Sequence, residues 1–376
     1  MKERLYAMLN AIGVVLFAVA LLGFSPLTTR GISQGLALCG RVLIPSLFPF
    51  MALAVFVGRS RAGAVFCRLL GPLCRRWLRL PPQLAPAVLM SFIGGYPVGA
   101  RMLAGMLDRG EATPEQAQRI LSFAITPAPS FAIVTLGAGL MGSTKAGTIL
   151  YGCHLFTALL LGGWYARRSK TPQTMETKSS SPLPFSAALV ESTSAAVEGM
   201  LSICGFVLLF STLLSFLQGC GATQLFGKVV AFLSCGKISA EAAAAALCGL
   251  LEITCGAFAC QTLSWQGICV LLPFLASFGS LSVLCQVSAC LNGRGVSTAA
   301  LLCGRLTHGF LSALMAAPLL WQFSPSVEAL ARPAQPLGGS APVLSTLALL
   351  GMCSLFLLSL EGTAPAKKFP SKSANF

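Results

Sequence analysis

The residues with the most distinctive chemistry in this sequence are charged or polar groups inside long apolar runs. Glu252 lies in the run 240–259 and has no basic neighbour along the chain. An ionised carboxylate in apolar surroundings is costly, so Glu252 must be paired, protonated or in contact with water. We therefore expect Glu252 to bind a polar solute or a coupling cation. The alternative is a structural ion pair with Arg305 or Arg101.

A second set of polar side chains accompanies Glu252. Arg305 and His308 are one helical turn apart and share a helix face, so both can contact an anionic group or pair with a carboxylate. Arg101 either pairs with a buried charge or extends toward the membrane surface. The second half of the chain also supplies hydrogen-bonding side chains, each of which is common in plain helix packing as well: Thr254, Ser280, Ser282 and Gln286.

The composition determines what kind of element must position these residues. Of the 376 residues, 55% are apolar and only 10% are charged, whereas a soluble domain carries about 25% charged residues. The apolar residues form several runs of about 20 residues or more, which is the length a helix needs to cross a membrane. We therefore predict an all-helical polytopic membrane protein. A soluble enzyme and a disordered chain are excluded.

Two apolar runs in the first half are interrupted. The run 84–107 is broken by glycines and a proline, and the run 117–139 is broken by two prolines. Free backbone groups at membrane depth are tolerated only where protein or a wet cavity satisfies them. A polar solute is one such partner, and packing of neighbouring helices is the alternative. The residues of the two breaks that we assign to the predicted solute site are Gly94, Gly95, Tyr96, Pro97, Thr126 and Ser130.

Charge and cysteine usage exclude several other functions. The net charge is +15, but the basic residues cluster beside apolar runs, as positive residues do in cytoplasmic loops. We therefore expect membrane lipid, and no nucleic acid, as a partner. The 15 cysteines form no C-x-x-C pair, and only two histidines are present, so we predict no metal site and no cofactor. No catalytic motif occurs, and we expect no enzymatic activity.

The chain divides at a polar linker rich in Ser, Thr and Lys. We predict that both termini are cytoplasmic and that the first helix is retained, with a cleaved signal peptide as the alternative. The expected parts are an N-terminal transmembrane helix at 1–31, a first repeat at 32–166, a cytoplasmic linker at 167–184, a second repeat at 185–321, and a loop, a last transmembrane helix and a basic tail at 322–376.

The two halves contain interrupted segments in the same order, a pattern typical of transporter-like sites. Residues 90–100 correspond to 247–257, and residues 129–134 correspond to 279–284. If the segment 84–107 enters and leaves on the cytoplasmic side, the basic linker is also cytoplasmic, as its charge requires. The second hairpin then enters from the opposite face. We predict an inverted repeat with two re-entrant hairpins and broken helices.

Several motifs resemble those of the YlbJ-type sporulation integral membrane proteins, in the nucleoside-recognition or Gate domain group. These motifs are SFIGGYPVGAR at 91–101, DRGEATPEQAQRILSFAITPAPSF at 108–131, GLLEITCGA at 249–257 and SFGSLSVLCQV at 277–287, within a resemblance that covers about residues 32 to 320. The resemblance implies two Gate-like repeats and a membrane protein needed for spore cortex formation in an endospore-forming bacterium.

The Gate group is similar to concentrative nucleoside transporters, whose solutes lie between two re-entrant hairpins and two broken helices. By this similarity, Glu252 matches a hairpin carboxylate, whereas Gly95 and Tyr96 stand in the first hairpin, where no carboxylate occurs. We expect the protein to transport or sense a small polar solute, with nucleoside-like solutes among the options. The alternative is a non-transporting scaffold that organises cortex-building proteins. A coupling cation, a second copy of the chain and sporulation proteins are the other expected partners.

Overall fold

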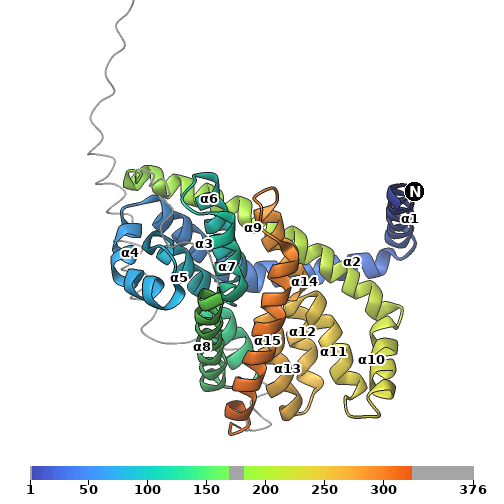
Figure 1. The fold of residues 1–376 in the computed structure, drawn as a ribbon. Helices are drawn as coiled ribbons and strands as arrows, with labels where there is room; N and C mark the ends of the chain where they lie inside the picture. Colours follow the sequence, from blue (N-terminus) through green and yellow to red (C-terminus); the bar gives the residue numbers. More distant parts are fainter. Residues whose placement is uncertain (1, 169–181, 324–376) are drawn as a thin grey trace, which may run out of the picture.

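The computed structural model describes residues 2–168 and 182–323, which are helical and contain no strand (Figure 1). Three wide-turn helical stretches (η1, η2 and η4) and two short tight ones (η3 and η5) accompany the α-helices. The elements of the first half are α1 (Lys2–Gly23), α2 (Ser25–Leu38), η1 (Cys39–Leu43), α3 (Ile44–Arg59), α4 (Ala62–Leu73), η2 (Cys74–Leu78), η3 (Pro82–Leu84), α5 (Ala85–Gly94), α6 (Tyr96–Asp108), α7 (Pro114–Ala124), η4 (Ser130–Leu140) and α8 (Thr144–Arg168). Those of the second half are α9 (Phe185–Gly219), α10 (Ala222–Leu233), α11 (Ala240–Leu251), α12 (Ile253–Ala259), η5 (Cys260–Thr262), α13 (Trp265–Phe278), α14 (Ser280–Leu291) and α15 (Thr298–Leu320).

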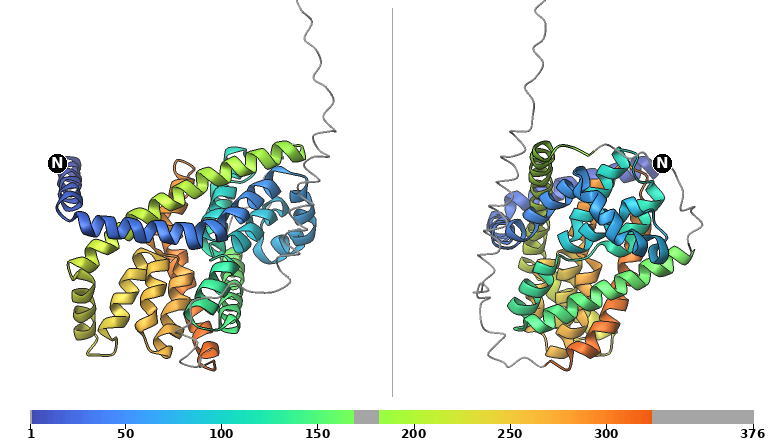
Figure 2. Two further views of the ribbon diagram at one scale, coloured as in Figure 1. Left: turned by 180° about the vertical axis from the view of Figure 1, so that it is seen from behind. Right: turned by 90° about the vertical axis from the view of Figure 1, so that its left-hand side faces the viewer.

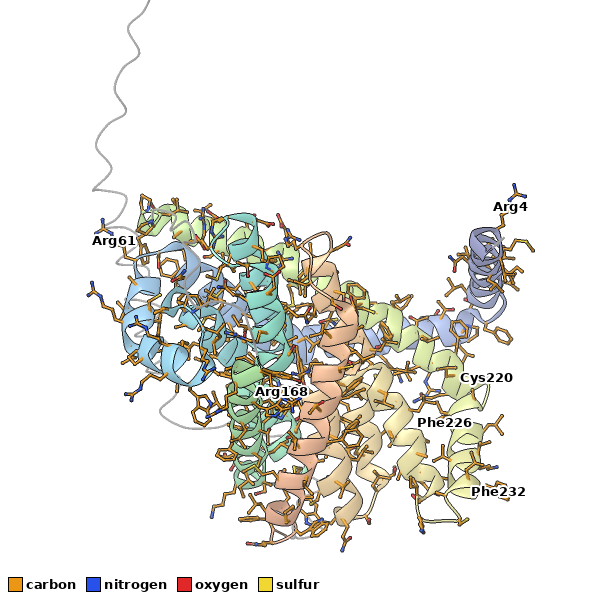
Figure 3. All side chains as sticks on the ribbon, viewed as in Figure 1. Arg4, Arg61, Arg168, Cys220, Phe226 and Phe232 are labelled. Carbon is orange, nitrogen blue, oxygen red and sulfur yellow. The ribbon has the colours of Figure 1, made fainter. Side chains whose placement is uncertain are left out.

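Long apolar helices confirm the predicted all-helical membrane architecture. Shorter apolar helices also expose apolar side chains on their outer faces: Phe232 on α10, for example, is 83% exposed and points away from the other helices (Figure 3). The predicted linker residues 169–181 and the predicted last transmembrane helix lie outside the described residues. By length and composition, five described segments can cross a membrane, namely Ser25–Arg59, Thr144–Arg168, Phe185–Gly219, Trp265–Leu291 and Thr298–Leu320.

Both halves of the described chain contain the same order of elements. A long helix is followed by a shorter helix, a helical hairpin, an interrupted helix and a closing long helix. The first series is α2–α3, α4, α5–α6, α7–η4 and α8, and the second is α9, α10, α11–α12, α13–α14 and α15. The first long helix begins at Ser25, so it runs across the domain boundary expected at residue 31. The loop after α6 and the turn before α11 lie at opposite ends of the molecule (Figure 1).

The long helix α2–α3 lies antiparallel to α9 (Figure 2). Gly31 and Gly35, spaced four residues apart, let the two backbones approach closely, as small residues do between membrane helices. A Cβ on Gly31 would lie 2.5 Å from the Cα of Thr212. At the other end of the pair, Arg59 binds Glu191 through two hydrogen bonds of 2.7 and 3.1 Å. The helix pair formed by α2–α3 and α9 joins the two halves of the chain and covers one side of the hairpins.

Candidate functional site

The first interrupted run forms a tight helical hairpin. Gly95 joins α5 to α6 with φ at +91°, a left-handed conformation that glycine adopts without steric cost. Pro97 stands in the first turn of α6. Its missing N–H costs no hydrogen bond there, because the first N–H groups of a helix have no partner within the helix. A Cβ on Gly99 would lie 2.9 Å from the Cα of Ser91, so the two arms lie against each other. The segment therefore folds back on itself instead of continuing as one kinked helix.

Glu252 stands at the turn of a second helical hairpin, between α11 and α12. Its Oε2 accepts a hydrogen bond of 2.7 Å from the N–H of Cys255 and so caps the N-terminus of α12. The arms touch through glycine, because a Cβ on Gly256 would overlap the Cα and N atoms of Gly249. Glu252 is only 2% exposed. The sequence thus places a carboxylate at the one point of this hairpin where the helix is interrupted.

The ion pair considered for Glu252 does not form in this structure. Within the described ranges, no contact of 4 Å or less joins its carboxylate to Arg305 or to Arg101. Beside Glu252, the buried Thr254 hydroxyl has no hydrogen-bond partner among the residues that the structure describes. Glu252 therefore has hydrogen-bonding capacity left over after capping α12.

The two interrupted helices bring further polar groups to the hairpin tips. Between α7 and η4, Thr126 is fully buried and donates to the carbonyl of Ser91 at 3.3 Å. Ser130 begins η4, and its buried hydroxyl has no partner in the described part of the chain. A Cβ on Gly95 would lie 3.1 Å from the backbone nitrogen of Ala128, so the first hairpin tip packs directly on this break.

The break between α13 and α14 contains two consecutive residues with positive φ angles. Gly279 and Ser280 have φ of +93° and +81°, and this conformation is strained for Ser280 because it carries a Cβ. The Ser280 hydroxyl accepts the N–H of Val283 at 3.3 Å. One turn farther along α14, Gln286 donates to the hydroxyl of Ser282 at 3.3 Å. The three predicted polar residues of α14, Ser280, Ser282 and Gln286, are all buried and lie in the first half of the helix.

The tips and the breaks meet in one buried region. The Tyr96 hydroxyl donates to the carbonyl of Ala276 at 2.5 Å, and its ring lies 3.4 Å from where a Cβ on Gly279 would stand. The helix α12 contacts both η4 and α14. The N-terminal end of α6 therefore lies against both breaks, and the helices that follow these breaks, η4 and α14, contact α12 of the Glu252 hairpin. Because helix N-termini carry partial positive charge and free N–H donors, this region favours an acceptor-rich polar group.

Arg305 and His308 are fully buried on α15, on the side of the α13–α14 break. The Arg305 Nε lies 3.5 Å from the carbonyl of Phe278, at the negative end of α13. Both of its terminal nitrogens lack a hydrogen-bond partner among the described residues. The Nε2 of His308 lies 3.1 Å from the carbonyl of His154 and 3.1 Å from the hydroxyl of Thr157. Arg305 is thus a buried cation with unused donors.

The comparison with curated proteins finds one integral membrane relative. The sporulation integral membrane protein YlbJ of Bacillus subtilis (strain 168) is 25% identical over 314 residues, which cover 77% of this chain and 76% of the relative. The resemblance to the YlbJ-type proteins is confirmed. No protein-family model matches the chain, and no solved structure shows a significant match. The similarity to an integral membrane protein and the five candidate spans among the described residues together indicate that this chain is a multi-spanning membrane protein.

The sequence pattern did not single out His154. His154 on α8 lies beside His308, with ring centroids 4.8 Å apart and the rings tilted at 45°, and its Nδ1 lies 2.6 Å from the Ser277 hydroxyl and 3.3 Å from that of Ser312. These partners come from α13 and α15, so only the tertiary fold reveals the cluster. The only sequence signal was a histidine inside an apolar run. No group of three metal-binding side chains occurs within residues 2–168 and 182–323.

Arg101 lies outside the buried region, which corrects its expected grouping with the buried charges. Its side chain is 26% exposed and donates to the carbonyl of Ala195 at 3.1 Å. Its nearest carboxylate is Glu198, at 4.0 Å. The Arg101 side chain therefore extends toward the surface of the helix bundle, which is one of the two placements that the sequence left open. Among the other predicted site residues, His308 lies against α8, and Gly94, Gly95, Tyr96, Pro97 and Glu252 form the two hairpin turns.

Proposed function

We propose that this chain is a sporulation membrane protein, needed for normal spore cortex formation, that transports or senses a small polar solute held between the two hairpin tips. The sporulation role is supported by the similarity to a sporulation integral membrane protein of Bacillus subtilis. The solute role is supported by one observation above all: Glu252 is buried at a hairpin tip, caps α12 and has no ion-pair partner in the described part of the chain.

The chemistry around Glu252 favours a solute with both donors and acceptors. Glu252 accepts hydrogen bonds, whereas the terminal nitrogens of Arg305 donate them. The hydroxyls of Ser130 and Thr254 can do either, and neither has a partner among the described residues. A nucleoside-like molecule, with hydroxyl, carbonyl and N–H groups, satisfies this set. Glu252 also offers an anionic ligand to a coupling cation. We propose no bond-making chemistry for this region.

The proposed mechanism requires the hairpins to approach the solute from opposite membrane faces. Binding near the midplane, between inverted repeats of the kind found in concentrative nucleoside transporters, allows one half to move against the other while the solute stays in place. The equivalent orders of elements in the two halves, and the opposite ends at which the hairpins begin, support this arrangement. Both termini are then cytoplasmic.

Cysteine labelling tests this orientation. In a variant whose other cysteines are replaced, the exposed Cys235 before α11 is expected to react with a membrane-impermeant maleimide only from outside the cell. The exposed Glu115 at the start of α7, replaced by Glu115→Cys in the same background without Cys235, is expected to react only after the membrane is opened. Reaction of both positions from the same side would rule out inverted hairpins.

Complementation tests the solute site. In a spore-former that lacks its YlbJ-type gene, the wild-type chain is expected to restore heat-resistant spores. Glu252→Gln keeps the size of the side chain but removes its charge, and a charged hydrogen bond is worth about 1.5 to 3 kcal/mol. We therefore expect Glu252→Gln to lower the number of heat-resistant spores toward that of the deletion strain, at equal membrane abundance.

Glu115→Gln is the matched control for this experiment. Glu115 is exposed in the first turn of α7, so its replacement removes the same charge far from the hairpin tips. This control is expected to restore heat-resistant spores fully. If Glu252→Gln restores them equally well, Glu252 has no role in solute binding, and the result favours a non-transporting scaffold that keeps the hairpin fold.

A further inference from the structure

A charged groove opens where the ends of α3, α6, α9 and α14 meet, separate from the hairpin tips. Its volume is about 350 Å³. Arg59 is the last residue of the candidate span Ser25–Arg59, and Arg294 lies just beyond the end of the candidate span Trp265–Leu291. The charged walls of the groove therefore lie at the ends of membrane-spanning segments. This is the depth at which lipid headgroups occur.

Most charges in this groove are neutralised in pairs. Arg59 holds Glu191, and Arg294 holds Asp108 through hydrogen bonds of 2.7 and 2.8 Å. The second contact lowers the pKa of the Asp108 carboxyl, chiefly through the hydrogen bond from Arg294, so Asp108 is ionised at neutral pH. Arg109 binds Glu111 through hydrogen bonds of 3.0 and 2.8 Å in the same manner.

Arg101 is the exception among the groove arginines. Its nearest carboxylate, Glu198, is 4.0 Å away, and the side chain of Glu198 is 73% exposed, so water weakens the attraction between them. The guanidinium is nevertheless held in place, because it donates to the carbonyl of Ala195 and packs against Gly199. Among the described residues, the groove thus has one fixed positive charge with no carboxylate closer than 4.0 Å. It is partly lined by the apolar side chains of Val55, Met102 and Ala289.

We propose that this groove binds the phosphate group of an anionic phospholipid headgroup, with Arg101 as the main contact. A phosphodiester carries one negative charge, which matches the one unbalanced arginine. The planar guanidinium donates two parallel hydrogen bonds to phosphate oxygens. Basic pockets between membrane helices at headgroup depth bind anionic lipids in this way. The apolar wall accepts the glycerol and the first carbons of the acyl chains. Free inorganic phosphate offers the same kind of phosphate oxygens without that apolar part.

Binding of defined lipids to the full-length chain tests this proposal. The protein is purified in a neutral detergent and mixed with phosphatidylglycerol, phosphatidylcholine or inorganic phosphate. Native mass spectrometry then counts bound lipid, and thermal unfolding measures stabilisation. We expect phosphatidylglycerol to bind and to raise the unfolding temperature, and the other two probes to do neither. Arg101→Gln is expected to weaken phosphatidylglycerol binding by about tenfold or more.

Two further variants make the result specific. Arg75→Gln removes an exposed arginine of η2, outside the groove, and is expected to bind phosphatidylglycerol like the wild type. Arg101→Lys keeps the charge but loses the paired donors, so an intermediate loss is expected even if Arg101→Gln fails to fold. Equal binding of phosphatidylcholine, equal loss in Arg75→Gln, or stabilisation by inorganic phosphate alone would each overturn the lipid assignment. None of these outcomes depends on the hairpin solute.

Discussion

Gly256→Val is expected to prevent accumulation of the folded protein in the membrane. A Cβ at this position overlaps backbone atoms of Gly249 on the facing arm, and backbone atoms cannot move aside as a flexible side chain can. Overpacking of an interior costs about 1 to 3 kcal/mol even where side chains can adjust. Here the arms of the Glu252 hairpin must separate, so we expect a larger loss, seen as reduced membrane abundance and aggregation after detergent extraction.

Gly205→Val is the matched control for Gly256→Val. It makes the same replacement within the long helix α9, where nothing lies within 4 Å of the added Cβ. Size-exclusion chromatography of detergent extracts is expected to give a normal peak for Gly205→Val and a weak or aggregated one for Gly256→Val. A normal peak for both would mean that the arms of this hairpin are not in close contact.

Arg305→Met is expected to stabilise the protein while removing its function. The Arg305 guanidinium is fully buried, with one hydrogen bond of 3.5 Å and two terminal nitrogens without described partners. Replacement of buried ionic groups by apolar side chains of similar size is often neutral or stabilising by about 1 to 4 kcal/mol. We therefore expect an unchanged or higher unfolding temperature in detergent. Heat-resistant spores, measured by complementation, are expected to fall because the solute loses its cationic contact.

The two readouts of Arg305→Met separate the possible roles of the side chain. If the unfolding temperature falls and spore heat resistance falls with it, Arg305 is a structural residue that holds the end of α13. Arg75→Met, at an exposed site on η2, controls for the general effect of removing one positive charge and is expected to change neither readout. A stable variant with full spore heat resistance would contradict the proposed contact with the solute.

The sequence predicted the interruptions of this fold because their causes are local. Glycine at position 95 permits a left-handed turn, and prolines at 127 and 129 cannot donate the hydrogen bonds that continue a helix. A lone acid in an apolar run identified Glu252, which stands at a hairpin turn. Local chain chemistry was therefore sufficient to place the breaks and the carboxylate.

The partners across the fold could not be predicted in the same way. His154 contacts Ser277 and Ser312 from segments more than 100 residues away, and no periodicity along the chain encodes that meeting. Arg101 illustrates the same limit, because the sequence left open both a buried partner and a place near the membrane surface, and the contact with α9 in a groove at the end of the spans decides between them. Packing between distant helices decides such contacts.

The contact at Gly31 has a consequence for how the protein sits in its bilayer. The segments Ser25–Arg59 and Phe185–Gly219 are each 35 residues long, or about 52 Å at 1.5 Å per residue, whereas the hydrocarbon layer is about 30 Å thick. Helices of this length lie oblique to the bilayer normal or extend beyond the hydrocarbon. Because the close glycine contact joins them, a thicker or thinner bilayer changes the tilt of both together. A mismatch between helix length and bilayer thickness would thus tilt the two halves of the chain together.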